Sequence, residues 1–242
     1  MSVRIQDTDG VRTITLDRPE KRNALTDRML DAAATAIETV GDAGCILLLG
    51  AGRVFSAGFD LKAADERTAP GVLQAQILSL SRVLEAIGDC AVPVVVGAQR
   101  AAIAGASAIV SAADLVVADR AAVIGYPVTR LGISPAVSGP TLERAALGAA
   151  RALLLDPRTV TAQRAHELGL VHELVDAPDG VGTAAGALAA SIASKPGGGV
   201  RATKAWVRTV SGAIDHAAAR EASLASIDSE TIERLRSEVW SR

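Results

Sequence analysis

Serine and histidine are the side chains here that suggest nucleophilic chemistry, but their spacing does not support it. A nucleophile elbow needs a glycine two residues before and two residues after its serine. Around Ser56, Gly58 meets the second condition, whereas Val54 stands at the first position. A serine triad also needs a free histidine, and the three histidines all lie late in the chain. A serine hydrolase is therefore not indicated.

Two His-Glu pairs, at 166–167 and 172–173, resemble fragments of a zinc-binding helix. An HExxH motif would place its second histidine at position 170 or 176, where Leu170 and Asp176 stand. Gly169 would also interrupt a helix between the two pairs. We interpret these histidines as core or surface residues, and we expect no metal site.

The glycines at 50 and 52 look like half of a dinucleotide-binding fingerprint. The third glycine of that motif would fall at position 55, which is Phe55, and no helix is predicted to follow at once. We therefore interpret the stretch as a tight turn.

Composition excludes several classes of partner. The 242 residues include 25 Lys+Arg and 27 Asp+Glu, a net charge of −2, so bulk charge does not indicate nucleic-acid binding. Aromatic residues make up only 2%, too few for a base-stacking platform. With 49% hydrophobic residues, the chain is too apolar to be disordered.

Cellular location and redox state follow from a few local features. Cys45 and Cys90 adjoin apolar runs, so we expect both to be reduced and buried. The first residues show no signal-peptide core, and mean hydropathy is +0.29. The most membrane-like stretch, 101–118, consists mostly of small residues and contains Asp114, which favours a helix packed inside a core. We expect a cytoplasmic protein.

The apolar pattern predicts alternating strands and helices followed by a helical tail. Helix 70–88 is supported by apolar residues at spacings of four and three, and the stretch 125–139, rich in Gly, Pro and Ser, predicts a structured loop. The other predicted elements are strands 11–16, 46–49, 94–96 and 115–118, helices 26–40, from 105, from 141 and from 161, and tail helices 184–193, 200–210 and 216–240, with a hinge at 195–199.

Three segments that follow predicted strands carry a more specific signal. They are residues 18–25 (RPEKRNAL), 55–62 (FSAGFDLK) and 103–107 (IAGAS). In this order and spacing they resemble the crotonase (enoyl-CoA hydratase/isomerase) superfamily, and the segments at 161–171 and 201–204 agree. The resemblance covers nearly the whole chain. It implies an α/β crotonase-like fold, a spiral of ββα units over 1–182, and a C-terminal helical oligomerisation region over 183–242 that forms a homotrimer or dimer of trimers.

The resemblance also implies a ligand and a way to hold it. Crotonases bind acyl-CoA thioesters, often in lipid metabolism, and stabilise an enolate-like oxyanion with two backbone N–H groups. The matching donors are Phe59 and Gly105, the latter at a predicted helix start where the helix dipole favours negative charge. Coenzyme A enters only as part of the substrate, so no separate cofactor is expected. The residues matching the family's CoA-binding loops are Lys21, Arg22, Ala24, Ala57, Asp60, Leu61 and Lys62. For Lys21, Arg22 and Lys62, pairing with CoA phosphates and plain solvated surface charge are equally good interpretations.

The departures from the family pattern bear on the reaction. Hydratases of this family use two glutamates, and the matching positions here are Ala108 and Val128. The Asn-Gly that precedes the oxyanion helix is replaced by Gln99 and Arg100. Neither alanine nor valine can carry a proton, so standard hydration is not expected.

Three alternatives stay open for the chemistry. The first is an acid or base from another position, and the candidates are Asp65, Glu66, Tyr126, Ser134 and Ser138. The second is a reaction that depends mainly on the oxyanion donors, such as thioester decarboxylation or an isomerisation. The third is a protein that binds acyl-CoA without turning it over. Leu73, Ile77 and Leu80 are candidates either for the acyl pocket or for the core.

Overall fold

Six strands form the main sheet of the computed structural model, which describes residues 2–65, 68–146 and 148–241. The first two strands are antiparallel and every later pair is parallel. In sheet order the strands are β1 (Val3–Thr8), β2 (Val11–Leu16), β3 (Cys45–Gly50), β4 (Val94–Ala98), β6 (Leu115–Asp119) and β9 (Glu173–Val175). β1 was not predicted, because only Val3 of its six residues is buried and the apolar pattern is therefore weak.

A second, smaller sheet continues the first beyond a sharp turn of the chain. It contains β5 (Ala101–Ile103), β7 (Val123–Gly125) and β8 (Val160–Thr161). Single bridges, Ser56 with Ala102 and Leu25 with Phe59, extend it toward earlier parts of the chain. Successive units thus consist of a strand in the main sheet, a short paired segment in the second sheet, and a helix. This arrangement confirms the predicted spiral of ββα units.

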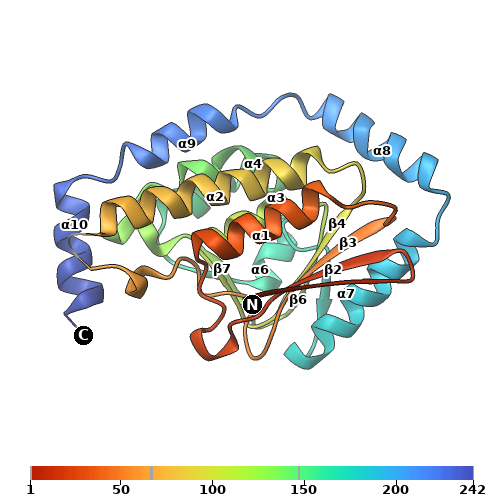
Figure 1. Cartoon of the computed structure of the whole chain (residues 1–242), viewed down its shortest axis with the longest axis horizontal. Coiled ribbons are helices and arrows are strands. Elements are labelled where there is room, and N and C mark those ends of the chain that lie inside the picture. Colours follow the sequence, from red (N-terminus) through yellow and green to blue (C-terminus); the bar gives the residue numbers. More distant parts are fainter. Residues whose placement is uncertain (1, 66–67, 147, 242) are drawn as a thin grey trace.

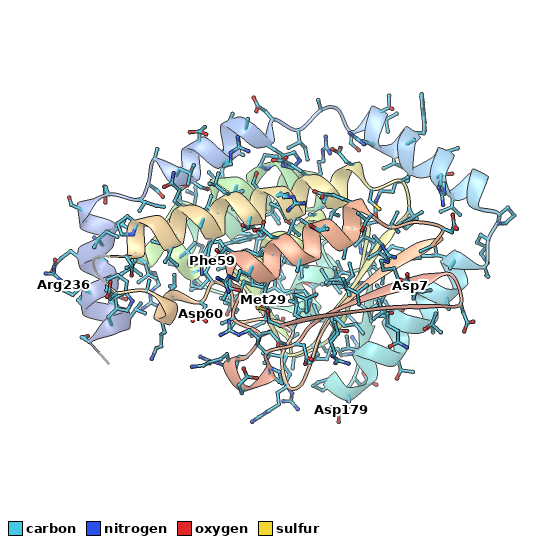
Figure 2. The ribbon with its side chains drawn as sticks, viewed as in Figure 1. Asp7, Met29, Phe59, Asp60, Asp179 and Arg236 are labelled. Carbon is cyan, nitrogen blue, oxygen red and sulfur yellow. The ribbon has the colours of Figure 1, made fainter. Side chains whose placement is uncertain are left out.

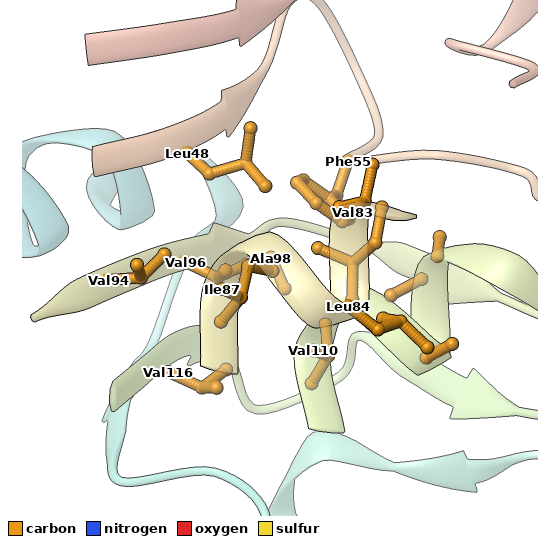
Figure 3. Packing of buried hydrophobic residues seen from close by; sticks show 14 of the residues in the cluster. Leu48, Phe55, Val83, Leu84, Ile87, Val94, Val96, Ala98, Val110 and Val116 are labelled. Atoms are coloured by element: carbon orange, nitrogen blue, oxygen red, sulfur yellow. The ribbon is translucent and has the colours of Figure 1, made fainter. Parts of the chain in front are cut away.

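Helices cover both faces of the main sheet. α1 (Asp27–Glu38) and α2 (Ala69–Asp89) lie side by side on one face (Figure 1). Thr26 caps α1, as predicted, by accepting a hydrogen bond from the Met29 amide. Figure 3 shows how β4 side chains such as Val94 and Val96 meet Ile87 of α2 in the larger core. The other helices of this region are α3 (Gly105–Ala112), α4 (Gly139–Ala145), α5 (Ala150–Leu155) and α6 (Ala162–Glu167).

The opposite face of the sheet is covered by α7 (Pro178–Ala193). Val181, Ala185 and Ala189 of this helix are buried in a second core cluster together with sheet residues such as Leu47 and Val117. The expected boundary between 182 and 183 therefore falls inside a helix that packs on the sheet. Cys45 belongs to the same cluster, and burial raises its pKa to about 12. Both cysteines are free and buried, as predicted.

The remaining helices form an arch along one side of the molecule (Figure 1). They are α8 (Gly197–Val210), α9 (His216–Leu224) and α10 (Ser229–Leu235), followed by a π-helical turn, Arg236–Trp240. The prediction of one helix over 216–240 was wrong: the Asp228 side chain accepts a hydrogen bond from the Thr231 amide and begins a new helix. No helix among the described residues is long and apolar enough to cross a membrane.

The predicted loop over 125–139 contains two 3₁₀ helices, Pro127–Leu131 and Ala136–Ser138. Two further 3₁₀ helices, Pro19–Lys21 and Leu61–Ala63, lie in the loops that follow β2 and β3. These short turns surround the ends of the second sheet, where the residues singled out by the sequence are found.

Candidate active site

Parallel pairing in the second sheet brings Phe59 and Gly105 together. Ser56 pairs with Ala102, through the Ser56 amide on the Ala101 carbonyl and the Ile103 amide on the Ser56 carbonyl, at 3.1 and 3.2 Å. Phe59 and Gly105 each lie three residues beyond a paired position, so the same register places them opposite one another. A Cβ atom on Gly105 would lie 3.0 Å from Cε1 of the Phe59 ring, which shows how close they are.

The Phe59 amide is directed away from the segment on its other side. The Gly58 carbonyl accepts from the Leu25 amide and the Asp60 amide donates to the Leu25 carbonyl, both at 2.8 Å. The Phe59 N–H belongs to the same trans peptide as the Gly58 carbonyl, so it points in the opposite direction from that carbonyl, away from Leu25. It makes no hydrogen bond with any described residue.

Gly105 presents its amide as the first residue of α3. The N–H groups of a first helical turn have no partner within the helix, and the Gly105 amide finds none among the described residues. The positive end of the helix dipole lies at the same point. The preceding residue, Ala104, has φ +55° and ψ −115°, a backbone conformation that is energetically unfavourable for any residue other than glycine. This strained turn ends the short strand and opens the helix at Gly105.

A buried polar network holds the segment that carries Phe59. The Asn23 side chain, fully buried, donates to the carbonyls of Ala51, Val54 and Phe55 at 2.8 to 3.0 Å. The Ser56 hydroxyl donates to the Asn23 carbonyl at 2.8 Å and accepts from the Gly58 amide at 3.2 Å.

An ion pair fixes the other end of the same segment. Arg18 and Asp60 are joined at 3.0 Å, and the Arg18 guanidinium also donates to the Ala24 carbonyl at 2.8 Å. The two loops expected to bind CoA are therefore tied to each other. The Asp60 carboxylate is engaged in this ion pair. Lys21 and Arg22, in the first loop, are exposed. In Figure 2, Phe59 and Asp60 lie next to one another near the middle of the molecule.

Gly58 and the turn at Gln99 and Arg100 also help to hold the segments that carry Phe59 and Gly105. A Cβ on Gly58, where φ is +87°, would lie 2.7 Å from the Ile103 carbonyl oxygen, so only glycine fits. Gln99 donates to the Gly50 carbonyl at 2.6 Å. Arg100 also has a positive φ, +57°, and its amide donates to the buried Asp119 carboxylate at 2.6 Å.

A cavity of about 310 Å³ opens beside the Phe59 backbone. Its lining is mostly apolar, with two charged side chains, Arg130 and Glu238. The lining residues are Ala57, Phe59, Leu61, Ile103, Ala104, Pro127, Val128, Arg130, Leu131, Ile133 and Glu238. Of the two positions that the sequence resemblance suggests for acid–base residues, Val128 lines this cavity, whereas Ala108 is fully buried in the core.

The alternative acid or base candidates lie outside this lining. The Asp65 carboxylate accepts hydrogen bonds from the Thr68 amide and hydroxyl at 2.9 and 2.8 Å, near the start of α2. Tyr126 is 1% exposed; burial raises the pKa of its hydroxyl, and the nearby Ser111 and Ser138 hydroxyls offset this only in part. Ser138 is also buried, and the Ser134 amide is bonded to the Ser226 hydroxyl at 2.8 Å. Glu66 lies outside the described residues.

A second cavity of about 440 Å³ lies between the residues that follow Leu61 and the C-terminal helical turn. Lys62 lines it together with Asp65, Arg236 and Trp240. The Trp240 indole N–H donates to the Leu61 carbonyl at 2.9 Å, which fixes the last helical turn over the loop that follows Phe59.

The sequence analysis assigned the C-terminal tail to oligomerisation and did not predict that its last residues line both cavities. Conversely, Leu73, Ile77 and Leu80 are buried and do not line the cavity beside Phe59. Leu73 instead packs with Ile133 and Leu235.

Comparisons with known proteins agree with this architecture. A family model described as enoyl-CoA hydratase/isomerase matches residues 6–234. A Rhodobacter capsulatus protein named "Probable enoyl-CoA hydratase" is 34% identical over 179 residues, 72% of this chain and 68% of that protein. A Rhodococcus jostii (7aS)-7a-methyl-1,5-dioxo-2,3,5,6,7,7a-hexahydro-1H-indene-carboxyl-CoA hydrolase is 32% identical over 184 residues, 70% of this chain and 66% of that one. The crystal structure of an enoyl-CoA hydratase/isomerase from Mycobacterium paratuberculosis matches with a TM-score of 0.86 and 25% identity, covering 98% of each chain.

The strained turn before α3 predicts an unusual stability effect. Replacing Ala104 with glycine should raise the free energy of unfolding by about 1 kcal/mol, because glycine adopts a positive φ without the side-chain penalty. The matched control is Ala106→Gly, inside α3, which should lower stability by about 1 kcal/mol or more. Urea unfolding of the three proteins at equal concentration measures both changes. Equal destabilisation by the two substitutions would show that Ala104 carries no backbone strain.

Proposed function

The chain belongs to the enoyl-CoA hydratase/isomerase family, and from this premise we propose that it binds an acyl-CoA thioester and stabilises an enolate-like oxyanion. One observation supports the proposal: the amides of Phe59 and Gly105, from distant segments, have no hydrogen-bond partner among the described residues, and Phe59 and Ala104, the residue before Gly105, line one mostly apolar cavity. Backbone donors placed before the reaction begins suit a charge that develops on a carbonyl oxygen.

The proposed mechanism assigns the substrate oxygen to these two donors. As electrons move onto the thioester oxygen, the Phe59 and Gly105 amides would donate hydrogen bonds to it, and the α3 dipole would add to the stabilisation. The rigid turn at Ala104 and the network around Asn23 would hold the donors still, so little reorganisation is needed during the reaction. The apolar lining, including Val128, Leu131 and Ile133, would enclose the acyl chain.

The reaction class we propose is a lyase or isomerase reaction on CoA thioesters, in fatty-acid or related acyl-CoA metabolism. Ala108 and Val128 offer no carboxylates for the two-glutamate hydration. The Rhodococcus relative, named as a hydrolase of a CoA ester, is compatible with chemistry other than hydration in related chains. A non-catalytic acyl-CoA-binding protein is the alternative, and the same amides and cavity would serve it.

For the coenzyme, we propose that Lys21, Arg22 and Lys62 face the phosphates. All three are exposed, and they lie in the two loops that the Arg18–Asp60 pair joins. Lys62 also lines the cavity beside Trp240, which adds an aromatic surface there. Coenzyme A remains part of the substrate in this proposal, and a separate cofactor is not invoked. The cytoplasmic location stays a prediction.

We further propose that the protein is a homotrimer or a dimer of trimers. The support is on α8, which lies at the outer edge of the molecule in Figure 1 and is joined to it by the Lys204–Asp114 ion pair at 2.7 Å. Its Trp206, Val207 and Val210 are exposed by 66%, 54% and 63%. Apolar side chains grouped on one helix in this way favour contact with another copy of the chain.

The first test offers the purified protein a panel of thioesters. We expect saturable binding of acyl-CoA by calorimetry, and crotonyl-CoA hydration far below ordinary hydratase rates, measured by loss of the conjugated thioester absorbance. The reason is the lack of carboxylates at Ala108 and Val128. Hydration at ordinary rates would contradict this reading, and failure to bind any acyl-CoA would overturn the proposed function. Binding with no chemistry on any thioester would select the non-catalytic alternative.

The second test removes one oxyanion donor. Gly105→Pro lacks the amide hydrogen, and proline is tolerated at the first position of a helix. We expect the exchange of the α-protons of butyryl-CoA with solvent deuterium, followed by NMR, to slow by about 10²- to 10³-fold. Gly105→Ala is the control: it retains the amide and requires only a small shift of the Phe59 ring. Equal rates in the two variants would show that this amide is not a donor.

The third test concerns assembly. Sedimentation at micromolar concentration should show a trimer or hexamer for the unchanged protein. Val210→Glu should reduce it to smaller species, because a charge would be buried at the contact. Leu155→Glu, at another exposed apolar residue (73%), should leave the assembly intact. A monomer in the unchanged protein would refute the proposal.

A further inference from the structure

We propose that the carboxylate of Glu238 is the acid–base group of this site, supplied by the C-terminal turn in place of the two glutamates that the family's hydratases use. The inference rests on the proposed function, since it needs an acyl-CoA thioester in the cavity beside Phe59.

The residue types of the cavity lining limit which side chain can transfer a proton. Among its described residues, two side chains are charged, Arg130 and Glu238, and the others are apolar. A guanidinium stays protonated in proteins and cannot act as a base. Glu238 is therefore the one described lining side chain that carries an acid–base group.

Packing and a hydrogen bond place Glu238 at the cavity. Three residues earlier, Leu235 is fully buried against Leu73 and Ile133. Two residues later, the Trp240 indole is bonded to the carbonyl of Leu61, which itself lines the cavity. The turn is thus fixed on both sides of Glu238, and its position relative to Phe59 follows from the fold.

Glu238 also differs from the acidic residues around it. Glu230 is joined to Arg234 at 2.7 Å and Glu233 to Arg236 at 2.9 Å. Glu238 is exposed, and within the described chain it makes no ion pair or hydrogen bond of this kind, although the Arg234 guanidinium acts on it as a nearby positive charge. Its carboxylate is therefore less committed to holding the helix together than the carboxylates of its neighbours are.

The step that we assign to Glu238 is proton transfer at the carbon next to the thioester carbonyl. The carboxylate takes a proton from this carbon, the C–H electron pair forms a carbon–carbon double bond, and the carbonyl π pair moves to the oxygen. The Phe59 and Gly105 amides hold that oxygen. The carboxylic acid at Glu238 then returns a proton to the same carbon or to another carbon of the conjugated system, which is an exchange or an isomerisation.

The test compares Glu238→Gln with the unchanged protein in two measurements. Binding of butyryl-CoA, by calorimetry, should change by less than about threefold, because glutamine keeps the shape of the side chain. Exchange of the α-protons with deuterium, by NMR, should slow by about 10²- to 10⁴-fold, the usual contribution of a general acid or base. Glu238→Asp should recover part of the rate.

Glu230→Gln is the matched control, since Glu230 lies on the same C-terminal segment and does not line the cavity. It should leave binding and exchange unchanged. If the unchanged protein binds butyryl-CoA but shows no exchange, or if Glu238→Gln exchanges at the full rate, the assignment of Glu238 is wrong while the thioester site stands. If the unchanged protein does not bind, the proposed function fails as well.

Discussion

The pairing of Ser56 with Ala102 is the constraint on which the candidate site depends. It is a parallel bridge between the loop that follows β3 and strand β5, and it fixes the relative register of the segments beyond it. Phe59 lies three residues after Ser56, and Gly105 lies three residues after Ala102, so the two can meet only in this register. A shift of one residue would turn one of the two amides away, because successive amides point to opposite sides. The geometry of the site is thus a property of the backbone.

Holding that register has a visible energetic cost. Ala104 and Arg100 both have positive φ angles, which non-glycine residues disfavour. Against these unfavourable turns stand the buried Asn23 carboxamide with its three carbonyl partners and the Asp119 carboxylate on the Arg100 amide. Strain that is concentrated beside two amides without hydrogen-bond partners among the described residues, and compensated by a buried polar network around it, is the arrangement expected at a functional site.

The sequence was most informative where local patterns decide structure. Thr26 predicted its helix cap, the continuous apolar run beginning at Ile46 predicted a buried strand, and the resemblance led to Phe59 and Gly105 as neighbours. It was least informative where long-range packing decides. Strand β1 forms by pairing with β2 although its side chains are mostly exposed. Nothing local indicates that Glu238 and Trp240 return to the loop beyond Phe59, since their positions depend on how the whole tail folds back.

Placing the proposed oxyanion donors in the main chain also affects how such a protein can evolve. An amide hydrogen is present in every residue except proline, so most mutations at or near these positions leave the donors in place. The surrounding side chains are then free to vary, and the same frame can acquire or lose a reaction by exchanging one or two of them. The alanine and valine at 108 and 128, which we match to acid–base positions of the family, would illustrate this freedom, since neither side chain affects the proposed backbone donors at Phe59 and Gly105. On such a frame the chemistry can change through side chains alone, while the two amides keep the positions that the backbone gives them.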